Sequence, residues 1–277
     1  MTEEQRLIHI PGVSAIPSSA AATVHHVFII DASGSMGVIR DSTISGFNEQ
    51  VDNIRKLEQE NTGQRNLVTL VFFDSRANVR YFDSSSSSLQ KLTRDDYPTA
   101  GGTRFYATVI EVINRLRQEL GDRATTERAI FTIITDGEDN VPEQGKRQGD
   151  LKELSQQVQR DNKWIVTFLG ANIDVERTAQ ELAIPLGNVV AYTTSHASAG
   201  RAFAAMSNSR DRVMRSLADD PDSINVASYY SASNQTTDLR DGIVQTDNAA
   251  GALLDGHVEW DELTQSFRKT RSTPPTP

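Results

Sequence analysis

The sequence has no cysteine, few aromatic residues and no long hydrophobic run. The lack of cysteine excludes disulfide bonds and thiolate zinc sites, and it is compatible with any compartment. No apolar run approaches the roughly 20 residues that a membrane-spanning helix needs. Residues 1–6 are acidic and polar and do not resemble the basic start of a signal peptide. We therefore expect a cytoplasmic protein without a membrane span.

Positive charge is also scarce, because 28 Lys and Arg residues face 37 Asp and Glu residues, which gives a net charge of −9. Much of the acidic excess lies from residue 219 onward, where ten acidic residues face four basic ones. An acidic surface argues against nucleic acid or an anionic membrane as the main partner. We expect neither.

A short apolar run, Val27–Ile30, ends in Asp31, and two serines follow at alternate positions. The run is typical of a buried strand, so Asp31 lies at its C-terminal end. Gly34 lets the backbone turn between Ser33 and Ser35. One carboxylate and two hydroxyls then converge, and such hard oxygen donors suit Mg²⁺ or Mn²⁺. Taken alone, the motif is equally consistent with an ordinary polar loop.

Two later stretches add oxygen ligands. A second apolar strand, 129–135, ends in Asp136 and Gly137. Between the two strands, the glycine-rich loop 99–103 ends in Thr103, just before a helical pattern. The first motif therefore does not stand alone.

The set Asp31, Ser33, Ser35, Thr103 and Asp136 resembles, position by position, the metal-ion-dependent adhesion site of von Willebrand factor A (vWA) domains. The resemblance covers about residues 23–218. It implies that the three hydroxyls contact the metal directly, and that the aspartates bind it directly or through waters. It also implies that a Glu or Asp of a partner protein replaces a water on the metal.

By the same resemblance, the protein is a non-catalytic, metal-dependent protein-binding module, an intracellular adaptor of bacterial or phage type. Relatives of this kind work beside AAA+ ATPases, kinases or other operon partners. Some family members also slide their final helix when the ligand of the metal changes, which would make 203–217 the moving element here.

Strand-like and helix-like stretches alternate along the chain. The expected strands are 27–30, 66–74, 78–82, 129–135, 164–170 and 188–192. This pattern predicts an α/β fold with a doubly wound, mostly parallel, Rossmann-like sheet of about six strands, one antiparallel edge strand, and helices on both faces. Such an order places the strands that end in Asp31 and Asp136 side by side, where ligands bind.

Three segments are expected along the chain. Residues 1–22 form a flexible leader, 23–218 form the vWA-like domain, and 219–277 form an acidic, largely irregular tail. Within the tail, Trp260, Leu263 and Phe267 have helical spacing, which favours a short helix over 258–269.

Two other functions are open. A Mg²⁺ ion near carboxylates supports phosphoryl transfer, but no phosphate-binding loop, nucleophile elbow or D-x-D motif accompanies it, so we do not expect an enzyme. The tail alternatively serves as an assembly arm of a structural protein.

Some polar residues near the motifs have two interpretations. Arg104 either draws an acidic ligand or is a solvated charge, and Glu138 and Asp139 either oppose such a ligand, bind a second cation or keep the loop soluble. His25 and His26 lie on opposite faces of a strand and are not expected to share a metal.

Overall fold

The computed structural model describes residues 22–144, 146–220, 222–230, 258–261 and 266–269. Its main feature is a six-stranded sheet with the order β3-β2-β1-β4-β5-β6. Only β3 is antiparallel to its neighbour, and the other strands are parallel. The strands are β1 (Ala22–Asp31), β2 (Gln64–Phe73), β3 (Ala77–Ser85), β4 (Arg128–Thr135), β5 (Ile165–Ala171) and β6 (Val189–Tyr192). The predicted fold class is confirmed.

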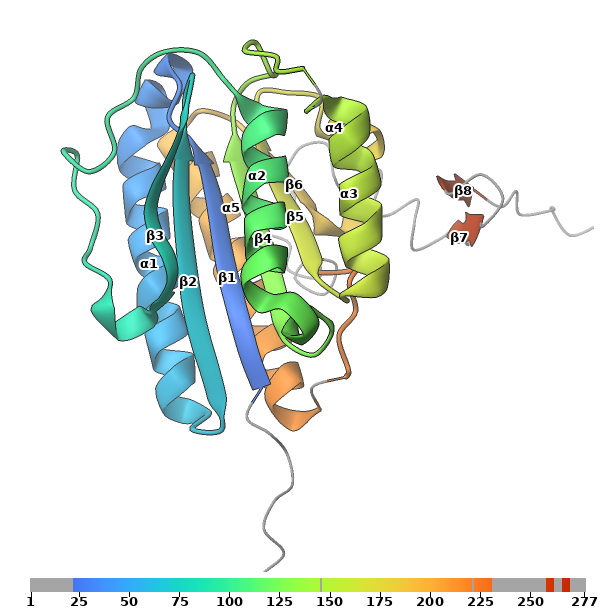
Figure 1. Ribbon diagram of the computed structural model, residues 1–277. Coiled ribbons are helices and arrows are strands. Elements are labelled where there is room, and N and C mark those ends of the chain that lie inside the picture. The colour runs from blue at the N-terminus through green and yellow to red at the C-terminus, as the bar shows by residue number, and fades with distance from the viewer. Residues whose placement is uncertain (1–21, 145, 221, 231–257, 262–265, 270–277) are drawn as a thin grey trace, which may run out of the picture.

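Five helices cover the two faces of this sheet (Figure 1). One face packs against α1 (Arg40–Glu60) and α5 (His196–Asp219), and the other against α2 (Phe105–Leu120), α3 (Gln148–Asp161) and α4 (Val175–Glu181). The central strand β1 is buried on both sides, so its apolar residues do not alternate with polar ones. The edge strand β3 is largely exposed or half-buried and carries more polar side chains.

The helices α1 and α5 pack closely because a glycine lies between them. A Cβ atom at Gly46 in α1 would overlap the ring of Phe203 in α5. The absence of a side chain at this position therefore lets the first and last helices of the domain approach each other.

The body of the domain extends past its predicted end at residue 218. Tyr229 and Tyr230 are buried, with exposed fractions of 0% and 2%. Their backbone N–H groups donate to Asn188 Oδ1 and to the Gly187 carbonyl, each at 2.8 Å. Residues 222–230 thus cover the start of β6, a role that their polar composition does not suggest.

Two short antiparallel strands replace the helix predicted over 258–269. They are β7 (Val258–Asp261) and β8 (Ser266–Lys269), paired so that Trp260 is opposite Phe267. The sequence Val-Glu-Trp-Asp alternates apolar and acidic residues, which is a strand period, and this local pattern prevails over the helical spacing. The predicted leader up to residue 21 and most of the predicted tail lie outside the described residues. None of the described helices has the length and apolar character needed to cross a bilayer.

Candidate metal centre

The two acidic residues of the predicted site come from the ends of adjacent parallel strands. β1 and β4 pair directly, with Ile30 opposite Ile134. Asp31 ends β1, and Asp136 follows the end of β4. The two carboxylates therefore emerge at the same edge of the sheet, as the sequence predicts for a doubly wound fold.

A chain of hydrogen bonds joins the two serines to Asp136. The hydroxyl of Ser35 donates to Asp136 Oδ1 at 2.7 Å, and Ser33 Oγ lies 3.1 Å from Ser35 Oγ. Since the single hydroxyl proton of Ser35 goes to the carboxylate, Ser33 is the donor to Ser35. Ser33 immediately precedes a 3₁₀ helix, Gly34–Ile39, and Ser35 lies in the first turn of that helix. The hydroxyls of the first motif are thus oriented toward the second.

The carboxylate of Asp31 is fully buried and held at both oxygens. Oδ1 accepts the backbone N–H of Ser33 at 2.7 Å, and Oδ2 accepts the hydroxyl of Thr135 at 2.6 Å. Thr135 is the last residue of β4. Sequence reasoning missed it, because only the pairing of β1 with β4 brings it next to Asp31.

Thr103 is placed by Asn140, which sequence reasoning also missed. Asn140 accepts the Thr103 N–H at its side-chain oxygen at 2.7 Å, and its own N–H donates to the Thr103 carbonyl at 3.0 Å. Thr103 is only 3% exposed, and its hydroxyl lies 3.6 Å from where a Cβ of Gly137 would be. The threonine therefore lies beside the loop that follows Asp136, although no hydrogen bond links it to the other four residues.

Burial makes the two carboxylates of the site hold protons more tightly. Desolvation is the main reason that the pKa of Asp31 is raised, and hydrogen bonds from Thr135 and Ser33 oppose the rise. Desolvation also raises the pKa of Asp136, and the hydrogen bond from Ser35 opposes it. A bound cation would supply the positive charge that favours both ionised forms.

The donor set fits a hard divalent cation. Among the described residues, no three His, Cys, Asp or Glu side chains are arranged to hold a metal ion. The candidate centre has two carboxylates, Asp31 and Asp136, and its other oxygens are hydroxyls. Oxygen-only ligands of this kind are those that Mg²⁺ and Mn²⁺ prefer.

Arg104 is held by two carboxylates and is not a freely solvated charge. Its guanidinium binds both oxygens of Glu111, at 2.9 and 2.7 Å, and also pairs with Glu143. Lys146 pairs with the same two glutamates. The interpretation of Arg104 as a solvated charge is corrected: its side chain is 14% exposed and anchors the loop that contains Asn140 to α2.

The acidic loop residues also have structural partners. Asp139 accepts the N–H groups of Tyr106, at the start of α2, and of Val141, at 2.8 and 3.1 Å. Glu138 pairs with Arg177 of α4.

The two histidines lie on opposite faces of β1, as predicted. His25 binds the carboxylates of Asp83 and Glu127, whereas His26 contacts Asn66 and Arg210. They have no common neighbour in these contacts.

No family model matches this chain, and neither does any curated protein. Solved structures do match. The vWF domain of the type V pili tip protein Mfa5 from Porphyromonas gingivalis aligns with a TM-score of 0.50 at 13% identity, over 70% of this chain and 97% of that chain. The fold is that of a vWA domain.

Another match to this vWA fold is proximal thread matrix protein 1 from the mussel byssus. It aligns with a TM-score of 0.50 at 14% identity, over 69% of this chain and 46% of that chain. The present chain thus spans about half the length of the mussel protein. At these identities the likeness concerns the fold.

Proposed function

We propose that this vWA-fold chain is a non-catalytic, divalent-metal-dependent protein-binding module that captures a partner carboxylate. The metal ligands would be Asp31, Ser33, Ser35, Thr103 and Asp136. The observation that carries the proposal is the hydrogen-bonded row Ser33–Ser35–Asp136, which gathers oxygens from two strand ends. When bound, Mg²⁺ or Mn²⁺ supplies an electrophilic position at which a Glu or Asp of the partner replaces water.

Charge balance supports an acidic ligand. Two carboxylates, Asp31 and Asp136, balance the charge of one divalent cation, and three hydroxyl ligands add none. An incoming carboxylate therefore meets a neutral centre instead of an anionic one. Thr135 and Asn140 would hold Asp31 and Thr103 in place without contacting the ligand.

An exposed apolar side chain next to the site supports a macromolecular partner. Val38 and Val79 are the exposed large hydrophobic residues among those that the structure describes, and Val38 is 65% exposed. Val38 lies in the same 3₁₀ helix as Ser35. A protein that docks its carboxylate at the site would bury this side chain and gain an apolar contact.

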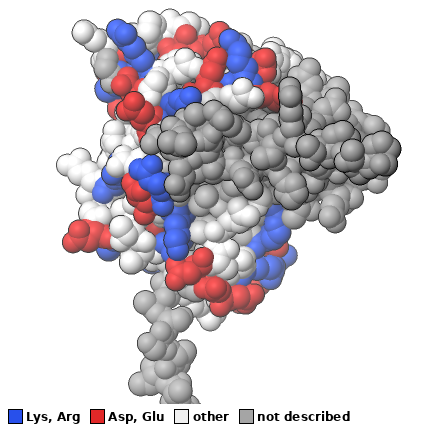
Figure 2. Space-filling model, turned by 90° about the vertical axis from the view of Figure 1, so that its right-hand side faces the viewer, with Lys and Arg blue, Asp and Glu red and all other residues white. Residues whose placement is uncertain are grey.

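The surface charge agrees with a protein partner. In Figure 2, the described part of the face shown carries basic and acidic side chains that are interspersed instead of gathered into one basic patch. The two similar structures are, by their names, a thread matrix protein and a pilus tip protein. The proposal also includes the intracellular adaptor role that the sequence resemblance implies, beside an AAA+ ATPase, a kinase or another operon partner.

Metal binding by the full-length protein is tested first, by calorimetric titration with MnCl₂ and MgCl₂. Ser35 is exposed, so Ser35→Ala should leave the fold intact while it removes one ligand and the bond to Asp136. We expect it to weaken metal binding by about tenfold or more, whereas Glu153→Ala, on the exposed side of α3, should bind like the wild type. Equal binding by all three proteins would contradict the site.

Partner capture is tested by pull-down from the native lysate. The wild type in Mg²⁺ should retain a protein that is lost in EDTA and lost with Asp31→Ala. Glu153→Ala should retain it. A partner held equally under all conditions would place the binding surface elsewhere on the domain.

A further inference from the structure

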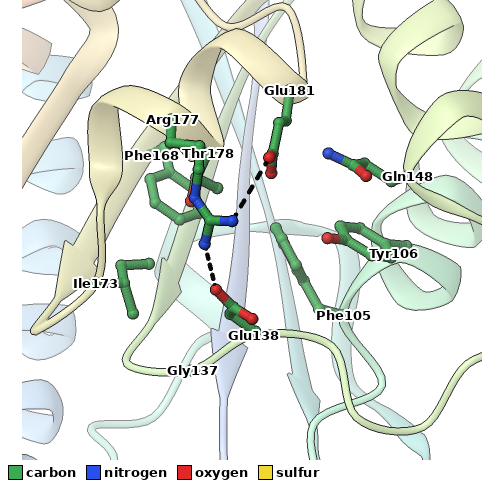
Figure 3. A pocket seen from close by; sticks show the side chains of 10 residues that line it. All are labelled: Phe105, Tyr106, Gly137, Glu138, Gln148, Phe168, Ile173, Arg177, Thr178 and Glu181. Carbon is green, nitrogen blue, oxygen red and sulfur yellow. Dashed lines mark hydrogen bonds and ion pairs between the residues drawn. The ribbon is translucent and has the colours of Figure 1, made fainter.

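A second feature of the same edge of the sheet is a pocket of about 190 Å³ beside the loop that follows Asp136. Figure 3 shows it between the start of α2, the loop residues Gly137 and Glu138, and α4. Phe105, Phe168 and Ile173 give it an apolar lining. Phe105 and Phe168 are 2% and 0% exposed, so the floor of the pocket belongs to the buried core.

The rim of the pocket is charged and carries one carboxylate in excess. Glu138 and Glu181 lie on either side of Arg177, and the guanidinium pairs with both, at 3.8 Å from Glu181 (Figure 3). Tyr106 and Gln148 direct their polar ends into the same space. The pocket thus combines aromatic rings, two carboxylates and two neutral polar groups around a single internal cation.

We propose that this pocket binds a basic side chain, Lys or Arg, from the partner segment whose carboxylate reaches the metal centre; this rests on the proposed function. Two carboxylates at the rim of a pocket are the partners that a guanidinium or ammonium group prefers. Arg177 shows the kind of group that the two glutamates accept. The partner's cation would take over one or both glutamates from Arg177.

The metal centre and the pocket are adjacent in the sequence. Gly137 and Glu138, which line the pocket, directly follow the metal ligand Asp136. A partner segment in extended conformation, which advances about 3.3 Å per residue, would reach both places with a few residues. The partner would then be recognised by an acidic and a basic residue close together in its sequence, and a purely acidic segment would be repelled by Glu138 and Glu181.

The pocket can be tested without the metal, using the ¹⁵N-labelled full chain in EDTA and N-acetyl-argininamide as the probe. The neutral N-acetyl-citrullinamide is the matched control. We expect the arginine probe to shift the amide signals of Tyr106, Gly137 and Glu138, and the citrulline probe to shift them much less. The double substitution E138Q/E181Q should abolish the difference between the probes, whereas Glu153→Gln should preserve it.

Arg177→Gln provides the sharpest comparison. If Arg177 is a replaceable occupant, its removal should tighten binding of the arginine probe by about two- to fivefold, which corresponds to the loss of an exposed ion pair. Unchanged or weaker binding would overturn the proposal, as would equal shifts from both probes.

Two further outcomes separate this proposal from its alternatives. Shifts in the signals of β8, which carries Arg268 and Lys269, upon Glu181→Gln would show that the chain's own segment fills the pocket and would overturn the partner assignment. Loss of Mn²⁺ binding in Ser35→Ala with an intact arginine-probe response would support both sites separately. If the chain does not bind a metal at the proposed site, the arginine probe should still shift the pocket signals in EDTA.

Discussion

Thr135 and Asn140 carry out much of the positioning in the candidate metal centre, although neither is a proposed ligand. Thr135 donates to Asp31 from the neighbouring strand, and Asn140 hydrogen-bonds both backbone polar groups of Thr103. Loss of a group that orients a ligand in this way typically lowers metal affinity by about 10- to 100-fold.

Thr135→Val should therefore weaken Mn²⁺ binding by about tenfold to a hundredfold, because it removes the hydroxyl that orients Asp31 while it keeps the volume. It should also lower the free energy of unfolding by about 1 to 3 kcal/mol, since a buried carboxylate loses a donor. Calorimetric titration and urea denaturation measure the two effects. Thr167→Val is the control: its buried hydroxyl donates to the Phe131 carbonyl at 3.1 Å, so it should cost stability without changing metal affinity. Wild-type affinity in Thr135→Val would contradict the role.

Glu111 gives a prediction for pH. The hydrogen bonds from Arg104, and then those from Lys146, lower the pKa of Glu111 from its ordinary 4.5 to about 2. Because this pKa is depressed in the folded state, Glu111 contributes stability above pH 4.5 and loses it as the pH falls toward 2. The side chain is 37% exposed, so the effect should be modest.

We expect Glu111→Gln to have a lower free energy of unfolding than the wild type at about pH 6. The difference between the two proteins should be smaller at about pH 3. Urea denaturation at both pH values measures this, with Glu153→Gln as an exposed control. A gap that stays constant with pH would contradict the assigned pKa.

At the scale of elements, α5 is attached to the sheet through a buried arginine. Arg210 is 0% exposed, and its guanidinium donates to His26 Nδ1, Gln50 Oε1 and Thr132 Oγ1 at 2.6, 3.1 and 2.9 Å. It also lies 4.6 Å from the centre of the Phe28 ring. Arginine can only donate, so Nδ1 of His26 accepts and Nε2 carries the proton toward Asn66. Burial, followed by the charge of Arg210, lowers the pKa of His26, which keeps this acceptor neutral.

Arg210→Lys should destabilise the domain by about 2 to 4 kcal/mol, although it preserves the charge. An ammonium group cannot serve three acceptors on α1, β1 and β4 in the fixed fork geometry of a guanidinium, so buried acceptors lose their donor. Denaturation by guanidinium chloride measures the effect. Arg160→Lys, 63% exposed on α3, should be nearly neutral. A loss below about 1 kcal/mol would mean that the three contacts do not fix α5.

Local sequence patterns predicted the elements well and their distant contacts poorly. The six strands and the helices follow from apolar runs and helical spacing, and the alternation of strands and helices fixes the sheet type. Thr135, Asn140 and Arg210 were missed because their partners lie between 37 and 184 residues away in the sequence. Arg104 was misjudged for the same reason, since Glu143 is supplied by another loop. The strand pair β7–β8 shows that short stretches with both periods cannot be assigned from spacing alone.

At the scale of the whole molecule, the buried core of the described residues includes Tyr229 and Tyr230. Composition suggested that the domain ends at 218, because residues after it are small and polar. Two buried aromatic rings, in edge contact at 4.8 Å between centroids, outweigh that composition. A few large side chains can thus attach a polar segment to a core.

Tyr229→Ala should lower the free energy of unfolding of the full-length chain by about 3 to 5 kcal/mol, as for a fully buried aromatic residue. Thermal and urea denaturation measure it. Asn225→Ala, at an exposed position of the same segment, should change stability by less than about 1 kcal/mol. An equally small effect of Tyr229→Ala would show that the segment does not belong to the domain.

The central position of β1 has a consequence for the synthesis of the protein. Phe28 and Ile30 of β1 pack in the same core as Phe203 and Met206 of α5, so this face of β1, which also contacts α1, is not fully covered until α5 has been made. At about 5 to 20 residues per second, a ribosome needs roughly 10 to 40 s to extend the chain from one to the other. Throughout that interval the nascent chain carries an apolar strand without its final cover, and chaperones that bind such segments would meet this protein before α5 is complete.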